Sequence, residues 1–185
     1  MKITTVQVLE NDTIDRFYDF FRAAFDPMRS RAAARHMLTA EEFAADMFNA
    51  RVDKYIAWDN DRAVGLFTLT NDLSAVPWIE PEFYGSRHPE QLARGALFYL
   101  GYILVDPRAN ATPGVIKAMT DAALRRCAES GGVLAFDLCT YNADRVGGRF
   151  IAGMLTNYGV RAAKVDVQSY YLADFADTPA QMHEG

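Results

Sequence analysis

Residues 102–119 read YILVDPRANATPGVIKAM and carry the strongest structural signal in the chain. The apolar run at 103–105 predicts a strand, which stops at the Asp-Pro pair at 106–107. A Thr-Pro-Gly turn at 112–114 then begins a helical pattern. A strand that leads through a loop to a helix N-terminus is a common place for proteins to bind an anion. The segment therefore raises the question of which anion it binds.

The same turn also has a purely structural interpretation. Thr112 is a favoured N-cap and Pro113 a favoured first helical residue, so a helix start needs nothing more. Pro113 has no N–H, and the Thr112 hydroxyl can accept from one of the amides that follow. The free amides that remain belong to residues 114–116, at the positive end of the helix. Arg108 or Lys117 can add a full positive charge.

Length and composition predict one soluble globular domain, residues 1–185, with a short flexible tail at 177–185. The chain has 185 residues, of which 50% are hydrophobic and 23% charged. Its net charge of −5 argues against nucleic acid as a partner. No apolar run reaches the roughly 18 residues of a membrane span, and the N-terminus does not resemble a signal peptide. Cys127 and Cys139 stand in apolar patterns, so we expect reduced core thiols and a cytoplasmic protein.

Hydrophobic periodicity predicts alternating strands and helices along the chain. Asp12 or Thr13 can cap the first helix, and Thr39 with Glu42 forms a capping-box pattern at the second. The strands are predicted at 3–9, 54–58, 63–70, 96–105, 133–141 and 163–175, and the helices at 12–25, 39–50, 113–132 and 148–159.

A long insert at 71–95 separates two strands that a tight turn would otherwise join. Long loops in compact domains are usually functional or disordered, and this one has too many rings for disorder. Trp78, Phe83 and Tyr84 can form the wall of an apolar pocket for an acceptor or an acyl group. A lid over the sheet edge, or a contact in a possible homodimer, remains an equally open interpretation.

The order of these elements resembles the GNAT superfamily of acyl-CoA-dependent N-acyltransferases over nearly the whole chain. The resemblance rests on VDPRANATPGVIKAM after a strand, and on NYGV after a short helix. It implies an α/β (α+β) fold with a mixed, mostly antiparallel sheet of about six to seven strands and about four helices. The family's loop reads Arg/Gln-x-x-Gly-x-Gly/Ala, and only Gly114 matches it, because Ala111 stands at the Arg/Gln position and Ile116 at the final small position.

The resemblance also implies roles for residues near this loop. Acetyl-CoA or another acyl-CoA would be the co-substrate, with no metal, and the acyl group would pass directly to a small-molecule amine. A backbone amide of the fourth strand, at Leu104 or Val105, would bind the thioester carbonyl and stabilise its developing charge. The pyrophosphate would lie against Arg108, Thr112, Gly114, Val115 and Ile116.

The general acid departs from the family pattern. The family often has a Tyr four residues before the Gly that ends its last helix, and here that position is Leu155, before Gly159. Tyr141, predicted at the end of the fifth strand, is the alternative acid. A partly buried ring with no catalytic role fits Tyr141 as well.

A proton acceptor for the attacking amine has several candidates. Glu80 and Glu82 flank Pro81 beside the aromatic residues of the insert, and His88 titrates near neutral pH. Asp137 falls in an apolar strand pattern, where it either points into the cleft or alternates outward. We select Glu80 and Glu82, although each can equally be a solvated loop carboxylate.

Three functions follow from the resemblance. The first is an N-acyltransferase that uses acyl-CoA and a small amine. The second is an enzyme similar to long-chain N-acyl amino acid or acyl-homoserine-lactone synthases, which take the acyl group from acyl carrier protein. The third is a GNAT-fold binding protein without catalysis. The degenerate loop and the missing Tyr motivate the last two.

Overall fold

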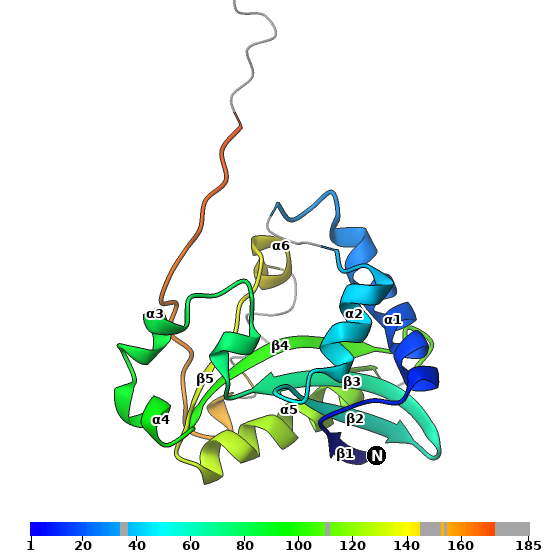
Figure 1. Cartoon of the computed structure of the whole chain (residues 1–185), viewed down its shortest axis with the longest axis horizontal. Coiled ribbons are helices and arrows are strands. Elements are labelled where there is room, and N and C mark those ends of the chain that lie inside the picture. Colours follow the sequence, from blue (N-terminus) through cyan, green and yellow to red (C-terminus); the bar gives the residue numbers. More distant parts are fainter. Residues whose placement is uncertain (34–36, 110–111, 145–152, 154, 173–185) are drawn as a thin grey trace, which may run out of the picture.

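The computed structural model describes residues 1–33, 37–109, 112–144, 153 and 155–172, and it is built on one sheet (Figure 1). The strand order is β1-β2-β3-β4-β5, antiparallel except for the parallel pair of β4 and β5. The predicted mixed, mostly antiparallel sheet is confirmed, with five strands among the described residues in place of six or seven. The bounds are β1 (Lys2–Val6), β2 (Asp53–Asp59), β3 (Arg62–Thr70), β4 (Leu97–Val105) and β5 (Val133–Ala135).

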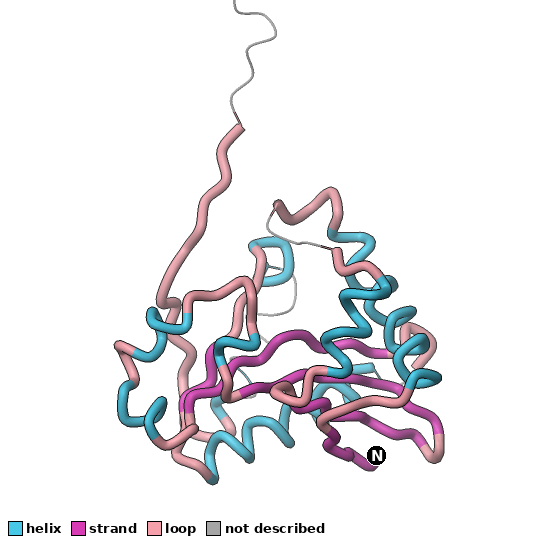
Figure 2. The backbone as a smooth tube through the Cα atoms, viewed as in Figure 1, coloured by secondary structure: helices cyan, strands magenta, loops and turns pink. Residues whose placement is uncertain are grey.

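Helices cover both faces of the sheet (Figure 2). The helices α1 (Asn11–Phe25) and α2 (Ala40–Phe48) pack on one face, and α5 (Thr112–Glu129) packs on the other. The division follows from period-2 alternation, which sends neighbouring strand residues to opposite faces. The α1–α2 face buries Ile56, Leu66, Tyr102 and Leu104, whereas the α5 face buries Tyr55, Val64, Phe67, Leu69 and Phe98.

The capping box predicted for α2 is confirmed. Thr39 Oγ1 accepts from the Glu42 amide at 3.2 Å, and the Glu42 carboxylate accepts from the Thr39 amide at 2.8 Å. The cap predicted for α1 at Asp12 or Thr13 is wrong, because the helix begins earlier and its N-cap residue is Glu10, whose side chain makes no capping bond. A cap is recognised by the helix start, and periodicity locates that start only to within a residue or two.

We expect Thr39→Ala to lower the free energy of unfolding by about 1 kcal/mol, because the Glu42 amide at the start of α2 loses its side-chain acceptor. Urea denaturation measures this effect. The matched control is Thr13→Ala, since Thr13 lies inside α1, and this variant should change stability by about half as much or less. Equal losses for both variants would contradict the role of the capping box.

The insert at 71–95 contains more regular structure than expected. It forms η2 (Leu73–Ala75), α3 (Pro81–Gly85) and α4 (Pro89–Ala93), with prolines at the starts of both α-helices. The Asn71 side-chain amide donates to the Gly95 carbonyl at 2.9 Å, which fastens the two ends of the insert together. Arg94 donates to the Ser130 carbonyl at 2.6 Å and so ties the insert to the end of α5.

The C-terminal half differs most from the prediction. β5 ends at Ala135 instead of residue 141, and the next element is the single turn α6 (Thr140–Asn142). The strand predicted at 163–175 is wrong, because residues 160–172 form no strand and expose side chains such as Val165 and Val167. Alternation alone cannot supply the partner that a strand needs. Half of the predicted helix 148–159, and the whole tail at 177–185, lie outside the described residues.

The remaining elements and the thiols complete the fold. A short 3₁₀ helix, η1 (Asp26–Met28), follows α1. Cys127 is buried on α5, where burial raises the pKa of its thiol to about 11. Cys139 is only half-buried and lies beyond β5, so its predicted place in a core strand is wrong. None of the described helices combines the length and the apolar character that crossing a membrane requires.

Candidate functional site

β4 and β5 separate from one another near the centre of the sheet. They pair only from Leu97 to Tyr99 on β4, opposite Val133 to Ala135 on β5. β5 then ends, while β4 continues to Val105 and keeps pairing with β3 on its other side. Figure 1 shows that the segment after β5 moves away from β4 and rises to α6. Among the described strands, the second half of β4 therefore has a neighbour on one side only.

Backbone direction decides which β4 amides face this opening. The Asp106 amide donates to the Val64 carbonyl of β3 at 2.9 Å. In an antiparallel pair, hydrogen-bonded and non-hydrogen-bonded residues alternate, so Leu104 also faces β3, opposite Leu66. Ile103 and Val105 then direct their amides away from β3, toward the side that β5 has left. Of the two predicted carbonyl-binding residues, Val105 faces the opening and Leu104 does not.

A β-bulge interrupts β4 in the same region. Phe67 of β3 pairs with Ile103, but Leu69 pairs with Leu100, so Thr68 lies opposite two residues of β4, Gly101 and Tyr102. The Tyr102 amide donates to Thr68 Oγ1 at 3.1 Å. A Cβ at residue 101 would lie 2.5 Å from the same oxygen, so only glycine fits there without displacing Thr68.

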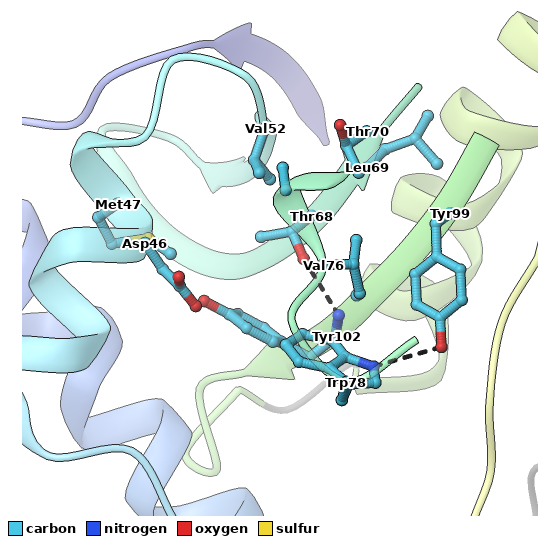
Figure 3. A pocket seen from close by; sticks show the side chains of 12 residues that line it. Asp46, Met47, Val52, Thr68, Leu69, Thr70, Val76, Trp78, Tyr99 and Tyr102 are labelled. Atoms are coloured by element: carbon cyan, nitrogen blue, oxygen red, sulfur yellow. Dashed lines mark hydrogen bonds between the residues drawn. The ribbon is translucent and has the colours of Figure 1, made fainter. Parts of the chain in front are cut away.

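The bulge brings Tyr99 and Tyr102 to one face of the sheet. In a regular strand, residues three apart point to opposite faces. Here both side chains line the same cavity of about 20 Å³, on the α1–α2 face (Figure 3). Asp46 and Met47 of α2, Thr68 of β3, and Val76 and Trp78 of the insert also line it.

Tyr99 is the centre of a hydrogen-bond chain that spans the point where β4 and β5 separate. Its fully buried ring carries a hydroxyl that donates to Asp137 Oδ1 at 2.7 Å and accepts from Trp78 Nε1 at 3.3 Å. Burial, followed by the nearby Asp137 carboxylate, raises the pKa of Tyr99, so the phenol remains a donor. Asp137 itself is exposed just beyond β5. The arrangement holds an accessible carboxylate at the rim of the opening.

The other end of the cavity has two polar side chains, and one of them lacks a hydrogen-bond partner in the part of the chain that the structure describes. The Tyr102 hydroxyl is buried and makes no hydrogen bond, and burial raises its pKa well above the usual value. Burial also raises the pKa of Asp46, against the opposing attraction of Lys54. Figure 3 shows the Asp46 carboxyl and the Tyr102 hydroxyl directed toward one another.

Lys54 is a fully buried cation beside this cavity, although it does not line it. Its ammonium donates to the carbonyls of Gln7 and Asn49, each at 2.7 Å. Burial lowers its pKa to about 8, although the charges of Asp46 and Asp53 oppose the shift. The two carbonyls connect the end of α2 to the segment that follows β1, which gives Lys54 a structural role.

A second charged cluster lies at the end of β4. The Asp106 carboxylate is fully buried and bonds to the Arg62 guanidinium, to the Arg108 amide at 2.9 Å and to Arg108 Nε at 3.1 Å. Arg16 lies 3.7 Å away. Burial alone would raise the pKa of Asp106, but the bonds from Arg62 and Arg108 outweigh it and lower the pKa to about 2.

Comparisons with known proteins show the fold. No family model matches the chain, and no curated protein matches it. A solved structure of a probable acetyltransferase matches with a TM-score of 0.56 at 13% identity, over 94% of this chain and 99% of the other. An aminoglycoside acetyltransferase from an uncultured soil metagenomic sample, in complex with sisomicin, matches with a TM-score of 0.54 at 16% identity, over 94% and 96%.

The chain has the GNAT fold. A further match, the aminoglycoside 6'-N-acetyltransferase from Enterococcus faecium, has a TM-score of 0.47 at 14% identity and covers 74% of this chain. This chain spans only 61% of that protein.

The residues predicted to bind the co-substrate lie at the end of β4 and at the start of α5. Thr112 is the first residue of α5, where we predicted the N-cap, and the preceding residue lies outside the described part. Among the described residues, no atom lies within 4 Å of where a Cβ at Gly114 would be, so these residues leave open space beside the first turn. The Val115 side chain packs against β3 at Gly65, which leaves only its backbone for a ligand. Arg108 is mostly exposed while it bonds to Asp106.

The predicted catalytic residues lie apart from the cavity. Glu80 and Glu82 are exposed, and the Glu80 carboxylate caps α3 by accepting from the Glu82 amide at 3.2 Å. Tyr141 was predicted at the end of the fifth strand, and this placement is wrong, because Tyr141 lies in α6. Its hydroxyl accepts from Arg31 at 2.6 Å, and the Arg31 guanidinium lies 5.0 Å from the ring centre. None of the three lines the cavity.

Three polar residues of the site escaped the prediction, namely Asp46, Tyr99 and Tyr102. Tyr99 and Tyr102 lie in the strand predicted at 96–105, and the sequence pattern singled out neither of them. The available signal was Gly101, because a glycine inside a strand often marks a bulge. Asp46 gave no signal, since one carboxylate on an amphipathic helix usually faces solvent.

Proposed function

We propose that the protein is an N-acyltransferase that transfers an acetyl or other acyl group from acyl-CoA to a small-molecule amine. The observation that carries this proposal is the second half of β4, whose outward amides face the side that β5 has left. Such amides can donate to the thioester carbonyl. Because the strand already fixes their direction, they need not reorient when negative charge develops on the carbonyl oxygen. The GNAT fold of the acetyltransferase structures supports the same function.

The donor end of the site would be the start of α5. Open space beside Gly114 lets a phosphate approach the backbone, and the helix end contributes partial positive charge. Arg108 adds a full charge, because its exposed guanidinium bonds to Asp106 at one edge and keeps other N–H groups for a ligand. These features can compensate for the glycines that the loop lacks.

Asp137 is the proton acceptor that we propose, in preference to Glu80 and Glu82. It is exposed beside the opening, and the Tyr99 hydroxyl fixes its orientation. Asp137 takes one proton from the substrate ammonium, and the freed amine attacks the thioester carbonyl carbon. The C–S bond then breaks, and the second proton on nitrogen passes to the departing thiolate. The products are the amide, the CoA thiol and protonated Asp137.

Release of free thiol from acetyl-CoA, measured across a panel of small primary amines, tests this function. We expect thiol to appear only when both an amine and the protein are present. Gly114→Val should raise the KM for acetyl-CoA about tenfold or more, because the new side chain occupies the open space beside α5. The fold should not suffer from a Cβ that meets nothing.

The KM for the amine serves as the internal control, and it should stay unchanged in Gly114→Val. Absence of thiol release with acetyl-CoA and with longer acyl-CoA donors, over the whole panel, would refute the proposed activity.

A further inference from the structure

The cavity between α2 and the bulge has features that the proposed transfer step does not use. Asp137 and the outward β4 amides suffice for the transfer. The cavity is lined by Tyr99, whose hydroxyl bonds to Asp137, and its polar end is formed by Asp46 and Tyr102.

The first feature is the Tyr102 hydroxyl. It is buried and has no hydrogen-bond partner among the described residues, and an unpaired buried hydroxyl costs about 1–3 kcal/mol. Tyrosine hydroxyls inside proteins usually find a partner. A phenol in this position is therefore explained best by a ligand group that bonds to it.

The second feature is the size of the space. About 20 Å³ is enough for a single group as large as a water molecule. A primary ammonium group has that size, whereas a branched or quaternary head does not fit. The cavity thus selects the narrow end of a ligand.

The third feature is the chemistry of the walls, which favours a cation over a neutral group. The Asp46 carboxylate lies beside the Tyr102 hydroxyl at one end of the cavity, and both of these oxygens can bond to an ammonium group. Burial raises the pKa of Asp46 despite the attraction of Lys54, and a cation bound against the carboxylate would offset this cost of burial. Two backbone carbonyls already bind the Lys54 ammonium, outside the lining of the cavity, so it does not fill the space itself.

We propose that this cavity is a subsite for a primary ammonium group, held by the Asp46 carboxylate and the Tyr102 hydroxyl. The inference rests on the proposed function, because the bound ammonium group is taken to be the end of the amine acceptor that does not react. Tyr99 joins the two ends of the site, since its ring lines the cavity and its hydroxyl holds Asp137. An acceptor that reaches both carboxylates is a compound with two primary amines on a flexible, unbranched linker.

The test has a binding arm without acyl-CoA. 1,5-Diaminopentane is titrated into the full chain and followed by NMR at the Gly101 amide and the Trp78 indole. We expect saturable shifts that 1,5-pentanediol does not produce. Asp46→Asn should weaken binding at least about tenfold, because a charge-assisted hydrogen bond is lost.

Two further variants complete this arm. Tyr102→Phe should weaken binding several-fold without loss of stability, since the hydroxyl has no partner to lose. Glu41→Gln removes one charge from the exposed side of the same helix and should leave binding unchanged. Equal binding by wild type and Asp46→Asn would overturn the subsite.

The second arm measures kcat/KM for 1,5-diaminopentane relative to 1-aminopentane. We expect wild type to prefer the diamine, and Asp46→Asn to lower this ratio about tenfold. Transfer to amines with an unchanged ratio would refute the subsite and leave the proposed function standing. Diamine binding that depends on Asp46, with no transfer to any amine, would refute the proposed function and leave the subsite standing.

Discussion

Asp137→Asn lowers kcat/KM for amine acylation by about 100-fold or more, because the variant has no carboxylate to accept the ammonium proton. The side chain keeps its size and can still accept from the Tyr99 hydroxyl, so the hydrogen-bond chain to Trp78 survives. The measurement is steady-state thiol release with saturating acetyl-CoA and a varied amine. The KM for acetyl-CoA should not change, because the donor end lies at the start of α5.

Tyr99→Phe separates positioning from proton transfer. It leaves the Asp137 carboxylate in place but removes the hydroxyl that orients it. We expect kcat to fall about tenfold, with less effect on the KM values. Wild-type kinetics in Asp137→Asn would contradict the role of Asp137 as proton acceptor and would favour Glu80 or Glu82 in that role.

The second large effect concerns the stability of the end of β4. We expect Asp106→Asn to lower the free energy of unfolding by about 2 kcal/mol. The buried carboxylate accepts from Arg62 and Arg108, and an amide cannot replace all of these bonds. The estimate lies below the usual loss for a broken buried pair, because the arginines are substantially exposed and regain water. Urea denaturation at neutral pH measures the loss, and Asp61→Asn in the exposed β2–β3 turn is the matched control.

The same carboxylate predicts a pH dependence. The folded-state pKa of Asp106, about 2, lies below its ordinary value of 3.8, so the unfolded chain binds the proton more readily. The contribution to stability is complete above the ordinary pKa and disappears as the pH falls toward 2. Asp106→Asn should therefore flatten the stability curve between about pH 4 and pH 2. An unchanged slope in this variant would contradict the role of the cluster.

Local signals predicted most elements of the fold. The capping box at Thr39, and the short connection between the strands predicted at 54–58 and 63–70, depend on residues close in sequence, and the structure contains both. At the turn, Asn60 has a φ of 52°, a left-handed conformation that Asn tolerates well. The length of β5 depends instead on how far it stays paired with β4. The long apolar pattern at 133–141 therefore corresponds to only a short strand. Tertiary pairing overrides periodicity at that point.

The candidate site was predicted less well, for a reason contained in β4. Period-2 alternation puts Tyr99 and Tyr102 on opposite faces, and only the extra residue of the bulge reunites them. Asp46 joins them from a helix that comes more than fifty residues earlier in the chain. Neither relation has a local pattern. The proposed donor end, by contrast, is formed by residues close in sequence, so a local pattern could point to the start of α5, and this assignment stays a prediction.

The fastened ends of the insert have a consequence for how this domain can diverge. One hydrogen bond, from Asn71 to Gly95, already joins the last residues of β3 to the first residues of β4. The interior of the insert can therefore lengthen, shorten or be exchanged without altering the register of the two strands. Trp78 is the residue of the insert that bonds to Tyr99. Exchange of the insert between homologues would thus change what approaches the acceptor side while the donor side is inherited intact.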